Sequence, residues 1–396
     1  MELTQEQQKI IFELQNWIKS MTNESDDEWI EVDKQFITIG GFAGTGKTTL
    51  ISHFRKILKE KYPKIKVAFC AYTGKATRVL KNKLEEAGAI YSTDSISTIQ
   101  GLIYNTIEDA QDRIIGWERK EEIKEDLIII DEASMVDQNI WEDITSYHVP
   151  IIAIGDHGQL PPINGNFNLM EKPQYSLIEI HRQAKDNPII KLSIHARNFG
   201  QIIPSNYSDT VIKVKKSDPD MGYRVEEIME RYDRDTLIIC GYNHTRIKLN
   251  KYIRQKIGME SELPIPGDRL ICLRNNHEAG IYNGMFGELL HIEDKDERRY
   301  KVEIRIEDTG EIYSGNILKV QFNNQQSLNF SENRRLTLDS DLFDFGYAVT
   351  VHKSQGGQAK RVIFFEEHMS KMDFDTKRRW LYTAVTRAQE ELYIIE

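Results

Sequence analysis

Residues 41–48 read Gly41-Phe42-Ala43-Gly44-Thr45-Gly46-Lys47-Thr48, which matches the phosphate-binding loop pattern G-x-x-x-x-G-K-[ST]. The stretch follows a short apolar run, Phe36–Ile39, and precedes residues 49–54, which have helical spacing. Its glycines let successive backbone N–H groups turn toward phosphate oxygens, and the N-terminus of the following helix adds partial positive charge. An ordinary glycine turn explains this spacing less well. The stretch therefore predicts a strand, a loop and a helix that together bind a nucleoside triphosphate.

Two side chains of this loop carry most of the expected chemistry. Lys47 is expected to hold the β- and γ-phosphates during catalysis, and the Thr48 hydroxyl is expected to coordinate Mg²⁺. The residues predicted to contact the nucleotide are Gly41, Ala43, Gly44, Thr45, Gly46, Lys47, Thr48 and Thr49.

Length, cysteine content and charge narrow the class of protein. The chain has 396 residues, enough for two or more domains with a large core. Its three widely spaced cysteines indicate neither a disulfide framework nor a metal motif, which favours a reducing, cytoplasmic location. No apolar stretch is long enough to predict a membrane partner. The net charge of -10 argues against a basic nucleic-acid coat, but not against a local nucleic-acid channel, because binding depends on local fields.

Short apolar runs recur along the chain, and they are continuous rather than alternating. Such runs are typical of strands in a parallel sheet that is covered on both faces. Helix-patterned segments between several of them complete βαβ units. The runs are Phe36–Ile39, Val67–Ala71, Leu127–Ile130, Ile151–Ile154, Leu237–Cys240, Val362–Phe365 and Leu392–Ile395. They fall into one group before residue 160 and another after residue 235, so we expect an α/β fold with two parallel-sheet units.

Residues 262–340 have a different pattern. Their apolar runs are short, several of them alternate, and turn residues separate them, as in a small antiparallel barrel. We interpret this segment as an insertion into the second unit, and a polar stretch at about 102–124 as a short insertion into the first. The expected domains are residues 1–170, residues 171–261 together with 341–396, and the β-barrel at 262–340.

Two carboxylates, Asp131 and Glu132, directly follow the run Leu127–Ile130. At the carboxyl edge of a parallel sheet, such a pair lies beside the phosphate loop. Asp131 is expected to hold Mg²⁺, and Glu132 to orient and deprotonate the attacking water. A plain strand-end turn is the alternative for an isolated pair, but the phosphate loop upstream favours the catalytic role.

A third polar segment follows the run Ile151–Ile154 and reads Gly155-Asp156-His157-Gly158-Gln159-Leu160-Pro161-Pro162. Gln159 carries a neutral amide that can sense a γ-phosphate, and the two prolines stiffen the chain behind it. We therefore predict that Gln159 takes part in catalysis as a γ-phosphate sensor.

The phosphate loop, the Asp131–Ser134 segment and the Gln159 segment, in this order, resemble the motifs of superfamily 1 helicases of the RecD/Dda-like branch. Other segments resemble further motifs of that family, in the family's order. They are Leu3-Thr4 with Gln7, 71–77, 97–100, 179–183, 243–246 with 249–250, 273–276 with 282–284, 350–356 and 382–388. The resemblance covers nearly the whole chain and implies two RecA-like P-loop domains.

The resemblance also implies ligands and residue roles. ATP would be the nucleotide, with Gln7 as the reader of adenine and with Gln355 and Gly356 close to it. Arg182 and Arg387 would reach the γ-phosphate from the second domain and stabilise developing charge. A surface salt bridge is the ordinary alternative for an arginine.

Nucleic-acid contacts are expected from hydroxyl, amide and charged groups that suit backbone recognition without base readout. The predicted residues are Thr73, Lys75, Thr98, Asn243, Thr350 and His352. Helix capping is the alternative role for the threonines.

The expected function is an ATP-dependent DNA helicase that moves 5′→3′ on single-stranded DNA. ATP bound between two domains of one chain would close a cleft, and hydrolysis would open it. Expected partners are single-stranded and tailed duplex DNA, with replication or single-strand-binding proteins as candidates, and the chain is expected to act as a monomer. The alternatives are a translocase that does not separate strands or acts on RNA, and a nucleotide-gated binding module without turnover.

Overall fold

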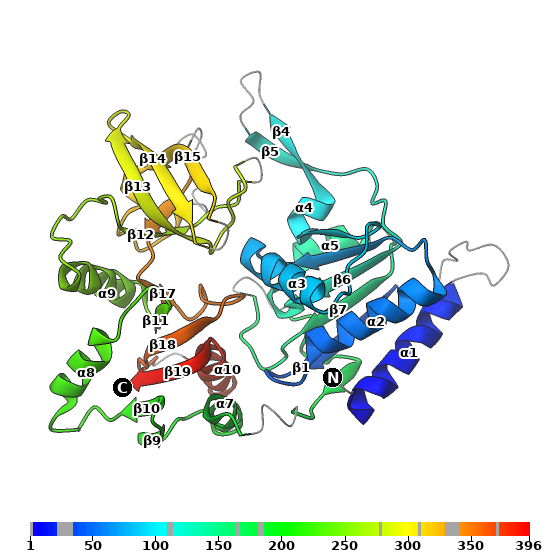
Figure 1. Cartoon of the computed structure of the whole chain (residues 1–396), viewed down its shortest axis with the longest axis horizontal. Coiled ribbons are helices and arrows are strands. Elements are labelled where there is room, and N and C mark those ends of the chain that lie inside the picture. The colour runs from blue at the N-terminus through cyan, green and yellow to red at the C-terminus, as the bar shows by residue number, and fades with distance from the viewer. Residues whose placement is uncertain are drawn as a thin grey trace. The chain divides into compact units, whose positions relative to one another are not determined.

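The computed structural model describes residues 3–21, 35–108, 114–162, 167–180, 186–276, 279–307, 310–328, 340–369 and 372–396. The chain divides into two compact units. The first contains residues 1–72 and 76–187, and the second contains residues 73–75 and 188–396. Each unit is built on its own six-stranded sheet (Figure 1).

The sheet of the first unit is parallel throughout, as the continuous apolar runs predict. Its strand order is β3 (Ser95–Thr98), β2 (Val67–Ala71), β6 (Leu127–Asp131), β7 (Ile151–Gly155), β1 (Phe36–Gly41) and β8 (Tyr175–Leu177). The helices of this unit are α1 (Gln5–Met21), α2 (Lys47–Lys61), α3 (Gly74–Glu86), α4 (Ile99–Ile103) and α5 (Gln138–Thr145), with a 3₁₀ turn η1 (Ala133–Met135).

Helices cover both faces of this first sheet. Leu127 and Ile129 of β6 pack with α1, α2 and α3 on one face. Ile128 and Ile130 of the same strand pack with α4 and α5 on the other face. Successive side chains of a strand point to opposite faces, so a strand that is apolar at every position must be buried on both. The unbroken Leu127–Ile130 run therefore explains the two-sided core.

The boundary between the units lies after Asn187, not after residue 170 as the sequence suggested. The reason is β8, which pairs in parallel with β1 through the registers Ile39 to Tyr175 and Gly41 to Leu177. A strand that completes the first sheet belongs to the first unit. Three residues form β8, too few for an apolar pattern to reveal it.

The second unit holds the other mostly parallel sheet. Its order is β17 (Ala348–Thr350), β11 (Thr236–Cys240), β18 (Ala359–Phe365), β19 (Ala388–Ile395), β10 (Val211–Val214) and β9 (Ser205–Ser208), and only the β9–β10 pair is antiparallel. The helices are α7 (Pro188–Phe199), α8 (Met221–Glu230), α9 (Asn243–Lys256) and α10 (Phe374–Val385). The predicted runs Leu237–Cys240, Val362–Phe365 and Leu392–Ile395 all form strands of this sheet.

Residues 262–340, the segment predicted as a β-barrel, contain four strands of a five-stranded antiparallel sheet of the second unit, and the fifth strand follows this segment. Its order is β15 (Ile312–Leu318), β14 (Arg299–Ile306), β13 (Phe286–Asp294), β12 (Arg269–Cys272) and β16 (Phe343–Phe345), and a 3₁₀ turn η2 (Lys319–Gln321) follows β15. An isolated bridge from Ile317 to Asp341 joins β15 to the chain just before β16.

Buried polar residues of α9 attach this antiparallel sheet to the rest of its unit. Arg246 donates to the Asp344 carboxylate at 2.8 Å. One turn further on, the Asn250 amide donates to the carbonyl of Phe345 at 3.2 Å and accepts from the N–H of Ala348 at 2.8 Å. Residues four apart lie on one face of a helix, so α9 presents a polar stripe to the backbone between the two sheets. The Asn243–Asn250 segment therefore has a structural role of its own.

The polar stretch at 102–124 contains a two-stranded antiparallel hairpin, β4 (Tyr104–Glu108) with β5 (Ile114–Arg119). It follows directly on α4 and projects from the first unit (Figure 1). No helix in the part of the chain that the structure describes is long and apolar enough to cross a membrane.

Candidate nucleotide-binding site

The phosphate loop connects β1 to α2, as predicted. Gly44 and Gly46 have φ angles of 80° and 76°, a left-handed region that side chains rarely adopt, so the loop needs glycine there. The Lys47 ammonium donates to the carbonyls of Gly41 at 2.7 Å and Phe42 at 3.2 Å. The lysine is therefore folded along its own loop, and its charge lies where phosphate oxygens bind in a loop of this kind.

Contacts within the phosphate loop stabilise its conformation. The Thr45 hydroxyl donates to the Phe42 carbonyl at 2.8 Å, and Thr45 is almost completely buried. A Cβ atom on Gly41 would lie 2.7 Å from that hydroxyl, so a larger residue there would displace it. Thr48 and Thr49 lie in the first turn of α2 and are half-buried.

Gln7 reaches this loop from α1. It forms a capping box with Thr4: the Thr4 N–H donates to the Gln7 amide oxygen at 3.0 Å, and the Gln7 N–H donates to the Thr4 hydroxyl at 3.2 Å. The Gln7 amide nitrogen also lies 3.3 Å from the carbonyl of Thr45 and 3.2 Å from that of Gly46. Gln7 thus fastens α1 to the phosphate loop, a role that sequence reasoning missed. Its assignment to adenine stays a prediction.

The two predicted carboxylates lie at the end of β6. Asp131 is the last residue of that strand, and its carboxylate accepts the N–H of Glu132 at 3.0 Å. Glu132 has φ 52° and ψ 38°, a left-handed conformation that is uncommon for a residue with a side chain. Such outliers persist where surrounding structure imposes them, and they concentrate at functional sites.

The oxygen donors fit the metal that the sequence predicts. Mg²⁺ prefers oxygen ligands and is usually held by one or two carboxylates together with substrate phosphates. The Thr48 hydroxyl and the Asp131 carboxylate are donors of that kind. Among the described residues no group of three or more His, Cys, Asp or Glu side chains forms a separate metal site.

The segment after β7 carries the third predicted element. Gln159 is buried, and its amide nitrogen lies 3.5 Å from the carboxylate of Asp156, which also accepts the N–H of Gly158 at 2.9 Å. Asp156 is itself buried and orients the turn, a role that sequence reasoning did not assign. The sequence feature that could have indicated this role is the position of Asp156, three residues before Gln159.

Packing brings the three strand ends together. In the sheet, β7 lies between β6 and β1. The rings of His157 and Phe42 lie with their centroids 3.9 Å apart, which joins the β7 segment to the phosphate loop. A Cβ atom on Gly155 would lie 2.8 Å from the Ser134 nitrogen, so the β7 end also adjoins the turn that follows Glu132. The structure thus collects Lys47, Asp131, Glu132 and Gln159 at one edge of one sheet.

The two predicted arginines differ in what the structure describes. Arg182 lies outside the described residues. Arg387 is 3% exposed, and its guanidinium donates to the carbonyls of Gly357 at 2.9 Å and Thr383 at 3.1 Å. It therefore braces the backbone inside the second unit. Its assignment to the γ-phosphate stays a prediction.

Gln355 and Gly356, predicted to lie near the nucleotide, form part of a turn after β17. The Gln355 N–H donates to the His352 carbonyl at 3.3 Å, and Gly356 has φ 74°. The position of these two residues relative to the phosphate loop stays a prediction.

Thr98 has the capping role that was the alternative to DNA contact. It is the N-cap of α4, where its hydroxyl accepts the N–H of Gly101 at 3.0 Å. Only 3% of its surface is exposed. A hydroxyl that is buried and already bonded is poorly placed for DNA, so the structure favours capping over the predicted contact.

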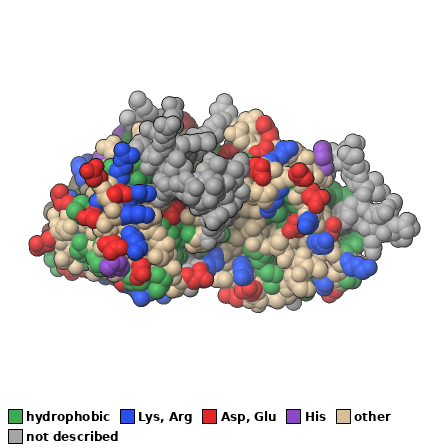
Figure 2. Space-filling model, turned by 90° about the horizontal axis from the view of Figure 1, so that it is seen from above, with side chains coloured by type: hydrophobic (Ala, Val, Ile, Leu, Met, Phe, Trp, Pro, Cys, Tyr) green, Lys and Arg blue, Asp and Glu red, His purple; other side chains and the backbone are tan. Residues whose placement is uncertain are grey.

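The other predicted nucleic-acid residues lie at strand ends or helix starts. Thr73 and Lys75 flank the beginning of α3, and Asn243 is the exposed first residue of α9. Thr350 ends β17, and His352 follows it; burial lowers the pKa of His352. On the face shown in Figure 2, acidic and basic side chains are interspersed, as the net charge of -10 suggests.

Lys353, next to His352, was not singled out by the sequence. Its ammonium donates to the side-chain oxygen of Asn283, and enclosure of that end lowers its pKa to about 8. Cys272 lies near enough to oppose this shift, whereas Arg246 adds to it. The lysine thus links the turn after β17 to the chain before β13.

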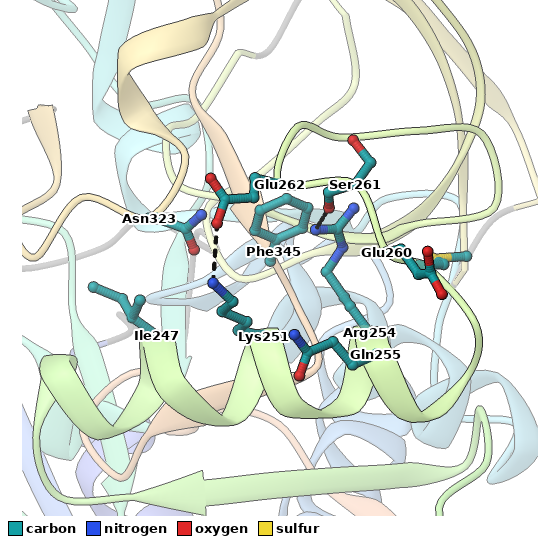
Figure 3. Close-up of a pocket in the computed structure, with 10 residues that line it drawn as sticks. Ile247, Lys251, Arg254, Gln255, Glu260, Ser261, Glu262, Asn323 and Phe345 are labelled. Atoms are coloured by element: carbon teal, nitrogen blue, oxygen red, sulfur yellow. Dashed lines mark hydrogen bonds and ion pairs between the residues drawn. The ribbon is translucent and has the colours of Figure 1, made fainter.

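A pocket of 220 Å³ lies beside α9 and contains none of the predicted site residues (Figure 3). Arg254 forms one wall: it pairs with Asp268 at 2.7 Å and lies over the Phe345 ring at 4.2 Å. Across the pocket, Lys251 and Glu262 form an ion pair at 3.0 Å (Figure 3). Lys251, Arg254 and Glu262 are thus already engaged in ion pairs, and the pocket belongs to the packing of α9 rather than to the nucleotide site.

Family models match both ends of the chain. A model described as an AAA domain matches residues 28–165, and a UvrD-like helicase C-terminal domain matches residues 345–395. The ATP-dependent RecD2 DNA helicase of Deinococcus radiodurans is 25% identical over 384 residues, which cover 91% of this chain and 46% of that protein. The RecBCD enzyme subunit RecD of Buchnera aphidicola is 25% identical over 435 residues, covering 90% and 70%.

Solved structures agree on the fold. The crystal structure of Pif1 helicase from Bacteroides in complex with ADP-AlF3 and ssDNA has a TM-score of 0.55 at 21% identity, covering 100% of this chain and 92% of that one. Fold and site therefore define a P-loop protein with a RecA-like parallel-sheet core.

Within that class, the chain is similar to superfamily 1 helicases of the RecD and Pif1 type, which confirms the predicted resemblance to RecD. The chain spans less than half of the RecD2 helicase, 46% of its length.

Proposed function

We propose that this chain hydrolyses Mg-ATP to move 5′→3′ along single-stranded DNA and to separate duplex DNA. One observation carries the proposal: the phosphate loop, the Asp131-Glu132 pair and the Gln159 segment meet at one edge of the first sheet. That arrangement has the parts that phosphoryl transfer to water requires, namely a phosphate cradle, a carboxylate for the water and a γ-phosphate contact.

Each residue has a separate task in this proposal. Lys47 holds the β- and γ-phosphates, and Thr48 with Asp131 would hold Mg²⁺, which neutralises phosphate charge when bound. Glu132 orients the attacking water and takes its proton. Gln159 contacts the γ-phosphate.

The remaining nucleotide contacts come from outside this group. The N–H groups and side chains of Gly41, Ala43, Gly44, Thr45, Gly46 and Thr49 would complete the phosphate cradle. Gln7 is assigned to adenine, with Gln355 and Gly356 near the nucleotide. Arg182 and Arg387 are assigned to the negative charge that develops on the γ-phosphate.

For DNA, the proposal uses the backbone-type contacts of Thr73, Lys75, Asn243, Thr350 and His352. The antiparallel sheet, as the small barrel of this family, would grip the strand, and the β4–β5 hairpin would split the duplex. The relatives support DNA as the polynucleotide because several are named DNA helicases and one neighbouring structure contains ssDNA. A monomer is the proposed acting form.

Two assays test this function in sequence. The first measures ATP hydrolysis with single-stranded DNA, with RNA and with neither, using Lys47→Ala as the inactive control. The second offers a fluorescent duplex with a 5′ tail and another with a 3′ tail. We expect DNA-stimulated hydrolysis and unwinding of the 5′-tailed duplex only.

Other outcomes would replace the proposal. An ATP hydrolysis rate that is the same with and without polynucleotide would show that the protein is not a nucleic-acid motor. A hydrolysis rate of Lys47→Ala equal to that of wild type would show that the phosphate loop is not needed for catalysis. DNA-stimulated hydrolysis without unwinding of either duplex would support a translocase.

A further inference from the structure

The base of the β4–β5 hairpin is attached to α5 by side chains from both of its strands. In the hairpin, Tyr104 and Arg119 lie directly opposite each other. The Tyr104 hydroxyl donates to the carboxylate of Asp143, which lies on α5. From the other strand, Arg119 lies 3.8 Å from the same carboxylate and donates to the hydroxyl of Ser146 at 2.8 Å. The Asp143 carboxylate thus interacts with both Tyr104 and Arg119, which face each other at the base of the hairpin.

A second tyrosine, Tyr147, contacts the backbone at both ends of the hairpin. The Tyr147 hydroxyl, just past α5, lies 2.9 Å from the Ile103 carbonyl and 2.8 Å from the Lys120 carbonyl. These carbonyls belong to the residue before β4 and the residue after β5. The Lys120 N–H also donates to the Ile103 carbonyl at 2.9 Å. The Tyr147 hydroxyl therefore holds together the two ends of the hairpin, where the backbone enters β4 and leaves β5.

These contacts matter because a two-stranded hairpin is only marginally stable alone in water. Tyr104 donates to an ionised acceptor, and such bonds are stronger than neutral ones. Desolvation and the Asp143 carboxylate both raise the pKa of Tyr104, so its hydroxyl keeps its proton at working pH. Arg119 is 50% exposed and adds less. The Tyr104–Asp143 bond is therefore the main side-chain anchor among the described residues of the hairpin.

The anchoring helix is also a close neighbour of the hydrolytic carboxylates along the chain. Glu132 is followed by η1 and then by Asp137, whose side chain accepts the N–H of Ile140 and caps α5. Trp141 and Ile144 of α5 pack into the core on the same face as Ile128 and Ile130 of β6. The helix that holds the hairpin is thus fixed to the strand that ends in Asp131.

We propose that Asp143, through Tyr104, is a positioning residue for strand separation, which holds the hairpin so that ATP-driven movement forces the duplex against it. This inference rests on the proposed function. Its consequence is specific: loss of the anchor reduces the base pairs separated per ATP hydrolysed, while hydrolysis itself continues, because no anchor residue belongs to the nucleotide site.

The test compares Tyr104→Phe and Asp143→Ala with wild type and with a matched control, Tyr62→Phe. Tyr62 is the half-buried C-cap residue of α2, so the control removes a tyrosine hydroxyl from the same unit away from the hairpin. Single-strand-stimulated ATP hydrolysis and unwinding of a 5′-tailed fluorescent duplex are measured on the same preparations. Thermal unfolding is recorded for each variant.

We expect hydrolysis by Tyr104→Phe and Asp143→Ala to stay within about twofold of wild type, and unwinding per ATP to fall about tenfold, as loss of a bond to a charged group predicts. The double variant should be no worse than Asp143→Ala alone, because Tyr104→Phe then removes a bond that is already lost. Tyr62→Phe should behave as wild type.

Two results would overturn the inference. One is unwinding per ATP equal to wild type in both variants. The other is a parallel loss of hydrolysis and unwinding with a lowered melting temperature, which would mean that the anchor only stabilises the fold. If wild type itself hydrolyses ATP but unwinds neither tailed duplex, the proposed function fails, and the inference fails with it because there is no strand separation for Asp143 to position.

Discussion

At the scale of single residues, burial changes what a side chain can do. Arg387 is predicted to reach a γ-phosphate, yet in the structure its guanidinium donates to carbonyls of its own unit. Residue type and neighbours indicated a functional arginine, but no local pattern reveals which carbonyls surround it. The carbonyl of Thr383 lies only four residues before Arg387, but that of Gly357 lies 30 residues before it, in the turn after β17.

Arg387→Ala should therefore have two effects. Buried carbonyls lose their donor, so the free energy of unfolding should fall by about 2 kcal/mol. Turnover per folded molecule should also fall sharply, with ATP affinity nearly unchanged, if the arginine acts in the transition state. Urea denaturation, nucleotide binding and steady-state hydrolysis separate these effects. An equal loss of ATP binding would contradict the transition-state role.

Lys353 makes stability depend on pH. Its pKa is about 8 in the folded protein against 10.5 ordinarily, so between these values the unfolded chain binds more protons. The contribution of this lysine to stability therefore rises with pH across that window. Lys353→Met removes the titration.

We expect the free energy of unfolding of wild type, minus that of Lys353→Met, to increase by up to about 3 kcal/mol from pH 8 to pH 10.5. Cys70 and Cys240, whose pKa values burial raises to about 12, titrate in both proteins and cancel in the difference. Cys272 interacts with Lys353, so its titration contributes to the difference near the upper end of this pH range. Urea denaturation at several pH values measures it. A difference that stays constant with pH would show that the ammonium is well solvated.

At the scale of elements, apolar runs predicted the longer strands correctly, whereas the helix-capping role of Thr98 was not the one assigned to it. Every predicted run forms a strand, because a strand buried on both faces must be apolar at successive positions. The strands β3, β8, β9, β10 and β17 of the two six-stranded sheets were missed because each has only three or four residues. Thr98 was assigned to DNA because the family motif contains it, whereas its observed role is to begin α4.

Thr98→Ala should lower the free energy of unfolding by about 1 kcal/mol, the usual cost of removing a cap, and Thr98→Ser should preserve it. Affinity for single-stranded DNA should change little in either variant. Thermal unfolding and fluorescence anisotropy with a labelled oligonucleotide check both statements. Weaker DNA binding by Thr98→Ala with an unchanged free energy of unfolding would support the original prediction that Thr98 contacts DNA.

At the scale of the whole molecule, charge limits how nucleic acid can be bound. The net charge is -10, and the DNA residues that we propose include only one lysine and one histidine, Lys75 and His352. In the proposed function, DNA binding would then depend mainly on hydroxyl and amide groups rather than on counterion release.

The affinity for single-stranded DNA should accordingly depend weakly on salt. Each neutralised phosphate of a single strand contributes a slope of about -0.7 in a plot of log K against log salt, so we expect a total no steeper than about -2. Anisotropy titrations over a range of salt concentrations measure the slope. A slope steeper than about -4 would reveal a basic surface outside the proposed residues.

The sequence by itself determined the chemistry: the phosphate loop, the carboxylates after β6, the glutamine after β7 and the two parallel-sheet units. These follow from local spacing, because strand, turn and helix N-terminus are set by residues near one another in the chain. Only the tertiary structure decided the boundary after Asn187, the bond from Gln7 to the phosphate loop and the anchor of the hairpin on Asp143. Each of these depends on groups that folding brings together, and the hydrogen bonds and strand pairs they make leave no period or motif in the sequence.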